Sequence, residues 1–582
     1  MSCAKAPVRM RKTGLAVGMA VAVALTACAG VPDRGKVHEG NALPVGNQDP
    51  DVQVRLIVHP PATGAKPEDV VAGFLVAAAG SQSDYAIART YLTSSAARSW
   101  QPTARALVYD DSASNAVGSA RPSGAARVVP LRAPLLATVS ADGDYTVATP
   151  GEAIHADFRL VREGGEWRIA NPPAGLLLTT LDLSRSLRPQ AVYFLNRDLS
   201  LVVPNTVFMS ATPPGLATAL MRALLHGPTA WLAPAVRTAI PAGTTLRSTV
   251  PVDDNGTATV DLSQQVLDST ASQRAQLSAQ IVWTLRNVPG LTRVRLLADG
   301  NPFDVPTAGS TQSRDAWPTY DPAALTPSAQ GYYRAGNRVM TVSGAHPPGL
   351  FGTSPSVLTD IALSPDLAFA AGLTHTGNRS TVYAGSLAAK PRAVYSADAA
   401  FTAPSWDASG ELWTVQLSPV PQVLVIRPAA PVVRVPAPGL AGLAIRELRI
   451  SRDGTRVAVV ARSGRGTELL VGRVSTTGDG ALRLDGFRVP DPTLGDVGHV
   501  TWADANTVLL LGRGPGGARI PWLVDVDGAN PGPLSTSGLT SYAAVAGAPG
   551  QPVLAESGGE IYQAAHGLWT PVGRGREPAY PG

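Results

Sequence analysis

Apolar residues at helical spacing come first in residues 51–187, and strand-like runs follow them. After an apolar strand at 52–58, Pro67 begins a predicted helix with Glu68 and Asp69 in its first turn. One face of this helix carries Val70, Val71, Phe74, Leu75 and Ala78, and a second helix is predicted to carry Ile87, Tyr91 and Leu92 and to end near Trp100. Strands are predicted at 105–111, 126–139, 145–149, 154–163 and 166–173. Helices followed by a meander of strands indicate an α+β domain.

Residues 188–304 predict a second α+β domain. Strands are expected at 191–196 and 199–208, and a helix follows Pro213-Pro214 and ends at Gly227-Pro228, where glycine and proline stop helices. The sequence Asp254-Asn255-Gly256 is typical of a tight hairpin turn between two strands. A second helix at 271–287 and a strand at 292–299 complete the domain. Residues 305–330 are rich in Pro, Ser, Thr and Ala, so we interpret them as an interdomain linker.

Residues 331–582 repeat a short β-rich pattern around a similar turn. Aligned positions recur after 43, 44, 52 and 44 residues, at Leu363, Trp406, Ile450, Trp502 and Ala546. A period of about 40–50 residues with some four strands per repeat predicts a β-propeller, in which sheets bury their faces against one another. Five full repeats are present, and residues 331–343 supply two more strands that help to close the ring. We therefore expect an all-β propeller of five or six blades.

The first 28 residues have the order of an export signal. A basic stretch, MSCAKAPVRMRK, precedes an uncharged apolar run that is shorter than the roughly 20 residues of a membrane span. Leu25-Thr26-Ala27-Cys28 resembles the bacterial lipobox, which implies cleavage before Cys28, an S-diacylglyceryl group on its thiol and an N-palmitoyl group on its amine. The alternative is an uncleaved signal anchor with an incidental cysteine. The only other cysteine, Cys3, lies within the predicted signal peptide (1–27), and the polar residues 28–50 are interpreted as a tether.

Composition and charge exclude two classes of protein. Hydrophobic residues make up 45% of the 582 residues and charged residues 16%, so the chain can bury cores and is not a disordered protein. The formal net charge is +5, but four of the 48 basic residues precede Cys28. The remaining 44 face 43 acidic residues. This balance argues against nucleic acid as a partner.

None of the motifs that could carry chemistry has the right context. The glycines at 512–517 match GxGxxG, but a strand follows where a phosphate-binding helix would have to begin. Asp525, Asp527 and Gly528 resemble the start of a calcium loop that lacks its other ligands. The eight histidines are scattered, without metal-ligand spacing. We expect no catalytic residues, cofactor or metal; a propeller enzyme that gathers ligands from separate blades is the alternative.

Two of the predicted domains resemble known modules. The first has the order of helices and strands of the NTF2-like cone. The runs LLHGP (224–228), IPAGTTL (240–246) and GTATVDLS (256–263) resemble the GerMN domain of sporulation and germination proteins. Together with the lipobox and the terminal propeller, this arrangement resembles the actinobacterial LpqB family of lipoproteins along nearly the whole chain. The resemblance implies a non-enzymatic envelope protein, and it transfers only Cys28 as a functional position.

The resemblance also implies a partner and a location. Proteins of this family are associated with the MtrA–MtrB two-component system, so we expect the chain to bind the extracellular domain of the sensor histidine kinase and to affect signalling, cell-wall homeostasis and division. The lipid would hold it on the extracytoplasmic face of the cell membrane. The rival hypothesis is a lipoprotein that binds glycan or peptide of the cell wall (peptidoglycan), either with Trp and Tyr side chains of the propeller or with a pocket in the first domain. For the five propeller tryptophans, packing in the core is the plainer expectation.

Overall fold

The computed structural model describes residues 58–582, apart from 81–83, 113–115, 211–212, 348–357, 428–429 and 535–536. The chain divides into the units 1–50 and 51–582, and all described residues belong to the second. The predicted signal peptide and lipobox, the tether at 28–50 and the predicted strand up to residue 57 lie outside the described residues. No helix in the described part is long and apolar enough to cross a membrane.

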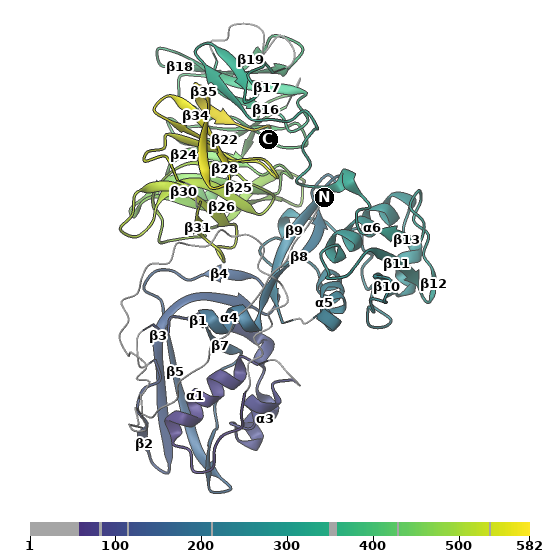
Figure 1. Cartoon of the computed structure of the whole chain (residues 1–582), viewed down its shortest axis with the longest axis vertical. Coiled ribbons are helices and arrows are strands. Elements are labelled where there is room, and N and C mark those ends of the chain that lie inside the picture. The colour runs from purple at the N-terminus through teal and green to yellow at the C-terminus, as the bar shows by residue number, and fades with distance from the viewer. Residues whose placement is uncertain are drawn as a thin grey trace, which may run out of the picture. The chain divides into compact units, whose positions relative to one another are not determined.

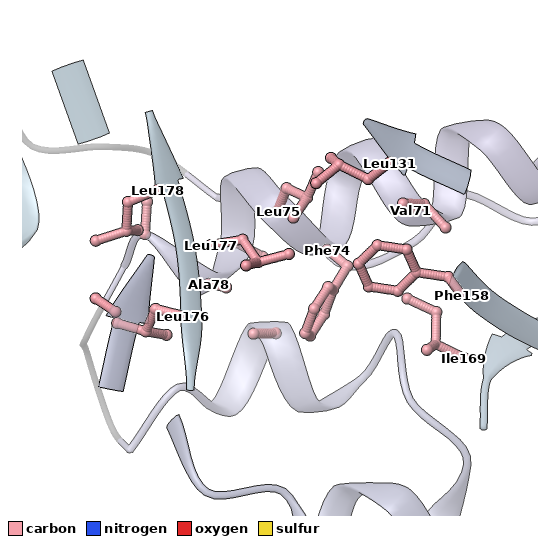
Figure 2. Close-up of a cluster of buried hydrophobic side chains, with 14 of the residues drawn as sticks. Val71, Phe74, Leu75, Ala78, Leu131, Phe158, Ile169, Leu176, Leu177 and Leu178 are labelled. Carbon is pink, nitrogen blue, oxygen red and sulfur yellow. The ribbon is translucent and has the colours of Figure 1, made fainter. Parts of the chain in front are cut away.

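The first module packs a helix on a sheet, as the sequence predicts (Figure 1). Helix α1 (Pro67–Ala78) begins with a proline and two acidic residues. Its apolar face carries Val71, Phe74 and Leu75, which lie among buried side chains of the sheet in Figure 2. The sheet has the order β6-β5-β3-β1-β7, with β2 and β4 paired to β3. Its strands are β1 (Arg105–Tyr109), β2 (Arg121–Ser123), β3 (Ala126–Ser140), β4 (Tyr145–Val147), β5 (Ala153–Glu163), β6 (Glu166–Ile169) and β7 (Leu176–Thr179), and α4 (Thr180–Ser186) follows.

The single second helix predicted in this module is wrong, because the chain forms two short helices there. These are α2 (Ala86–Arg89) and α3 (Ser94–Ser99). Between them the backbone pairs with the end of β6: the amide of Ile169 donates to the carbonyl of Tyr91 (2.9 Å), and the amide of Thr93 donates to the carbonyl of Ile169 (2.9 Å). Residues 91–93 therefore pair with the sheet and cannot continue a helix, and the Thr93 side chain caps α3.

The second module has the predicted elements. Strands β8 (Arg188–Leu195) and β9 (Val202–Met209) pair with each other, and α5 (Pro213–His226) and α6 (Ala271–Leu285) share a core with a second sheet. That sheet contains β10 (Thr257–Leu262), β11 (Arg293–Ala298), β12 (Asn301–Pro302) and β13 (Thr311–Ser313). The turn before β10 needs glycine, since Gly256 has a φ of +73° and an added Cβ would lie 2.5 Å from a backbone oxygen. The strand expected before that turn is reduced to two isolated bridges, Leu246 to Leu262 and Val252 to Ala258.

The interdomain linker predicted at 305–330 is partly folded, so the prediction from its composition was wrong for part of the segment. Strand β13 pairs antiparallel with β11, and Gln312 is buried, with its Oε1 accepting from Ser278 (2.6 Å). The carbonyl of Trp317 accepts a hydrogen bond from Trp283 Nε1 (3.2 Å). The polar and small residues that suggested a linker instead form a short strand of the sheet and make side-chain hydrogen bonds.

The last module is a ring of antiparallel sheets. Its described part contains five four-stranded sheets and one three-stranded sheet, here called blades 1–5 and the closing blade. Blade 1 contains β16 (Thr359–Leu363), β17 (Phe369–Thr376), β18 (Arg379–Ser386) and β19 (Arg392–Ala397). Blade 2 contains β20 (Ser405–Trp406), β21 (Leu412–Gln416), β22 (Gln422–Ile426) and β23 (Val433–Val435). Blade 3 contains β24 (Ala444–Ile450), β25 (Arg456–Ser463), β26 (Gly466–Thr476) and β27 (Leu482–Arg488).

Blades 4 and 5 and the closing blade complete the ring. Blade 4 contains β28 (Gly495–Trp502), β29 (Thr507–Arg513), β30 (Arg519–Asp525) and β31 (Gly532–Pro533), and blade 5 contains β32 (Ala544–Ala546), β33 (Leu554–Ser557), β34 (Glu560–Ala565) and β35 (Leu568–Arg574). In the closing blade, β14 (Tyr332–Ala335) pairs with β15 (Arg338–Thr341) and with β36 (Arg576–Ala579). The two strands predicted at 331–343 thus join the two ends of the module.

The propeller tryptophans pack inside the blades. Trp406 and Trp413 are 1% and 0% exposed, Trp502 and Trp569 are buried, and Trp522 packs half-buried against the core of blade 4. The prediction that these tryptophans pack in the core is confirmed. They are therefore not free to stack on a cell-wall sugar, as the rival hypothesis would need. The GxGxxG match spans the end of β29 and the loop that leads into the antiparallel strand β30, and no helix begins there.

Candidate functional site

The predicted lipidation site lies outside the described residues, so Cys28 and the lipobox residues Leu25, Thr26 and Ala27 stay predictions. Two concentrations of buried charge occur elsewhere. One is the hub, where the first strands of the blades and β36 line a cavity of about 70 Å³. The other is the junction, where residues 140–147 of the first module contact both other modules.

Carboxylates link neighbouring blades across the hub. Glu447 Oε2 on β24 accepts the amide N–H of Val500 on β28 (2.9 Å), and Glu577 Oε2 on β36 accepts the amide N–H of Asp360 on β16 (3.0 Å). The pairing registers of β16, β24 and β28 are irregular here. Irregular pairing frees backbone N–H groups, and a buried N–H needs an acceptor. The hub carboxylates supply it from the next blade.

Arg449 joins three consecutive blades. Its Nη2 and Nε donate to Glu447 Oε1 at 2.8 and 3.2 Å, its Nη1 donates to the carbonyl of Pro404 before β20 (3.0 Å), and its Nε also reaches the carbonyl of Val500 (3.3 Å). The Arg449 and Glu447 side chains are 21% and 12% exposed. A guanidinium that satisfies acceptors on several strands holds their spacing.

His499 lies on β28 with a φ of +51°, unusual for a residue with a side chain. Its Nδ1 accepts from the amide of Val545 on β32 (3.4 Å). Burial lowers the pKa of His499, and the nearby Glu447 carboxylate opposes this without reversing it. The imidazole is therefore neutral at neutral pH, which leaves Nδ1 able to accept.

The hub is a self-satisfied network rather than a ligand site. Its cavity of about 70 Å³ is far below the ~300–1,000 Å³ of ligand pockets. Its charged groups hydrogen-bond one another and the backbone. Among the described residues, no group of three His, Cys, Asp or Glu side chains could hold a metal ion. What the geometry of the hub achieves is the closure of the ring.

Blade 2 holds a buried carboxyl group outside the hub, that of Asp407. Asp407 Oδ2 accepts from Trp413 Nε1 (3.0 Å), and its Oδ1 accepts the amide of Glu411 (2.9 Å). Burial raises the pKa of Asp407 to about 7, and the neighbouring Glu411 carboxylate adds to the rise. Glu411 in turn pairs with Arg427 of the same blade and with Arg197 of the second module (3.2 Å). The ion pair between Glu411 and Arg197 therefore links the second module to the propeller.

The junction brings all three modules together. The amide of Phe208, on β9, donates to the carbonyl of Gly143 (2.9 Å), and the Tyr145 ring stacks on Phe208 with ring centroids 5.0 Å apart. Arg488, at the end of β27, pairs with Asp144 (Nη1–Oδ1 3.0 Å). Each of these two side chains is less than a fifth exposed.

The same arginine also contacts the second module. Its guanidinium lies 4.6 Å from the ring centroid of Trp231, whose Nε1 donates to the carbonyl of Gly486 (2.6 Å). Asp142 accepts the amide of Ala230 (2.8 Å). The junction therefore combines charge, ring and backbone contacts from the three modules, and it lies within the single unit 51–582.

Local sequence patterns do not reveal either cluster. Asp144 and Arg488 are 344 residues apart, and Glu577 and Asp360 are 217 apart. One signal was available for the hub: Gly495 and Gly498 interrupt a strand of blade 4, and glycine inside a strand often marks a bulge.

Comparisons with known proteins match most of the described chain. Three family models fit consecutive stretches: the N-terminal domain of lipoprotein LpqB at 60–184, a sporulation and spore germination domain at 191–304, and the LpqB β-propeller domain at 337–581. Among solved structures, TolB from Acinetobacter baumannii is 18% identical with a TM-score of 0.35, covering 44% of this chain and 66% of that chain. The first GerMN domain of GerM from Bacillus subtilis is 21% identical with a TM-score of 0.19, covering 22% and 98%.

Curated relatives match over nearly the full length. Lipoprotein LpqB of Thermobifida fusca is 32% identical, covering 97% of both chains. Lipoprotein LpqB of Streptomyces coelicolor is 30% identical, covering 96% of both. The identity, the coverage and the order of the three matched domains agree, and the chain belongs to the LpqB family of lipoproteins.

Proposed function

We propose that this protein is a lipid-anchored, extracytoplasmic binding protein without catalytic activity, whose partner is the extracellular domain of a sensor histidine kinase. The two acyl chains of the diacylglyceryl group on Cys28 would already hold it at the membrane, since one chain alone binds only marginally. Confinement to the same surface as a membrane-bound kinase raises the effective concentration of each for the other.

The observation that carries the proposal is the junction. A binding protein that acts on a kinase must favour one state of the kinase, and a surface of fixed shape discriminates between states better than loosely linked domains. The contacts of Asp144, Gly143 and Tyr145 with the other two modules support such a surface. The hub network supports a closed, rigid ring in the same way.

Co-purification from solubilised membranes tests the proposal. We expect affinity-tagged protein to recover a sensor histidine kinase, and we expect purified peptidoglycan not to retain the protein. Retention on peptidoglycan without recovery of a kinase would replace the proposal with the cell-wall-binding alternative. Turnover of wall fragments by the purified protein would contradict the absence of catalysis.

A further inference from the structure

A groove of about 480 Å³ lies on the propeller between blades 2 and 3. This volume falls in the range of ~300–1,000 Å³ that is usual for ligand pockets. Its lining combines β23 and the turn before β22 with the segment that leads into β24. Buried apolar side chains form much of that lining, namely Val423, Val435, Leu440 and Ile445, and Val420 stands 65% exposed at the edge.

Two arginines are the charged residues of this lining, and no carboxylate is among the described residues that form it. Arg434 is exposed, and no described carboxylate lies within 4.0 Å of it. The Arg483 side chain is 43% exposed, and its Nε lies 3.6 Å from Asp485, which already accepts a 2.6 Å bond from Arg473. The groove therefore offers guanidinium donors to an incoming carboxylate.

An unsatisfied acceptor accompanies these donors. Gln422 also lines the groove, and its Oε1 is buried without a hydrogen-bond partner among the described residues. A buried side-chain oxygen of this kind usually has a partner, because an unpaired buried acceptor is unfavourable. A ligand that brings an N–H group into the groove would satisfy it.

We propose that this groove binds an extended acidic peptide segment of a partner protein, with an Asp or Glu side chain on Arg434 and Arg483 and small apolar side chains on the groove wall. A peptide has the three features that the groove asks for: N–H donors, a carboxylate and small apolar groups. Polyphosphates lack the N–H donors and the apolar groups, and a neutral sugar lacks the carboxylate. This site goes beyond the proposed function, because it does not depend on the partner being a kinase.

Selection from a random 12-residue peptide library on the purified full chain tests the site. Parallel selections use the double variant Arg434→Gln/Arg483→Gln and the matched control Arg379→Gln/Arg574→Gln, which removes two exposed propeller arginines outside the groove. The wild-type protein and the control are expected to enrich sequences with Asp or Glu beside Val, Ala or Pro, and the groove variant is not. The melting temperature of the groove variant is expected to match that of the wild type.

Calorimetric titration with the enriched consensus peptide completes the test. We expect at least a tenfold loss of affinity in the groove variant, a similar loss when Gln or Asn replaces the acidic residue of the peptide, and weaker binding at high salt. A smaller loss is expected for Gln422→Leu. Equal enrichment on the groove variant, or no acidic consensus on the wild type, overturns the proposal. Tighter binding of a peptidoglycan stem peptide than of the consensus peptide overturns the choice of a protein segment.

Discussion

Arg488 of the propeller and Asp144 of the first module form an ion pair in which both side chains are less than a fifth exposed. Removing one partner of such a pair leaves the other charge without compensation in a poorly solvated place. The arginine still lies over the Trp231 ring, so the contact is weakened rather than lost.

The substitution Asp144→Ala is expected to destabilise the junction by about 1–3 kcal/mol. Hydrogen exchange at the amide of Phe208, which donates to Gly143, should speed up, because this bond closes the same contact. The control is Asp157→Ala, whose pair with Arg132 is 57% and 44% exposed and whose loss should cost less than about 0.5 kcal/mol. Unchanged exchange at Phe208 would show that the modules are not held through this pair.

Gly528 gives a second test of the junction. Its φ is +81°, and an added Cβ would meet the carbonyl oxygen of Pro490 at 2.0 Å and the Val147 side chain of the first module at 2.6 Å. We expect Gly528→Ala to lower the free energy of unfolding by on the order of 3 kcal/mol, because the Pro490 carbonyl cannot move aside without distorting the backbone. Gly516→Ala is the matched control, with a φ of +67° and no atom within 4 Å of the new Cβ. Calorimetry should show about 1 kcal/mol for this variant; equal effects of the two would contradict close packing at Gly528.

The hub predicts a strong effect for one carboxylate. Glu447→Ala leaves the guanidinium of Arg449 without its carboxylate partner and the amide of Val500 without its acceptor, so we expect a loss of about 2–4 kcal/mol in chemical denaturation. Glu560→Ala removes a carboxylate whose partner, Arg574, is 92% exposed, and it should change stability by less than about 0.5 kcal/mol. Similar stabilities of the two variants would mean that the hub network does not hold the ring.

The lowered pKa of His499 makes stability depend on pH in one direction. The unfolded chain takes up the proton near pH 6.5, whereas the buried imidazole resists it, so the contribution is complete above about pH 6.5 and is lost as the pH falls. The slope is at most about 1.4 kcal/mol per pH unit. Asp407 acts in the opposite sense: because its pKa is raised to about 7, its contribution is complete below the ordinary value of 3.8 and is lost as the pH rises through 7.

The substitution His499→Asn separates these effects, because asparagine tolerates a positive φ and does not titrate. The stability difference between the wild type and this variant should shrink steadily as the pH falls from 7.5 to 5, because only the wild type takes up a proton on unfolding. A difference that is constant over this range would contradict a buried, neutral imidazole.

The lipid anchor is tested at Cys28. The variant Cys28→Ala should leave the membrane fraction and incorporate no palmitate, because the thiol that accepts the diacylglyceryl group is missing. Membrane attachment that persists in this variant would favour the uncleaved signal anchor.

Repeats and local patterns predicted much of the fold. The five aligned positions Leu363, Trp406, Ile450, Trp502 and Ala546 are the last residues of the first strands of blades 1–5. Connections of similar, though not equal, length follow these strands. Helix α1 was predicted from its proline, acids and apolar face. The break at 91–93 and the folded segment around Gln312 were not predicted, since each depends on a partner strand far away in the sequence.

The candidate sites were harder to predict for the same reason. A charged residue such as Arg449 or Asp144 has no local sequence pattern that marks it as buried; its partners are set by the closure of the ring and by the packing of modules. The groove around Arg434 is likewise formed by two blades, and only folding brings its lining together.

Cross-linking in intact cells, followed by mass spectrometry of the protein's covalent adducts, most directly tests the proposal that the protein acts by binding a sensor kinase. We expect adducts between the extracellular domain of a sensor kinase and the described modules, on a chain whose first residue is an acylated Cys28. An unmodified chain released from the cell, or adducts to wall fragments alone, would contradict it.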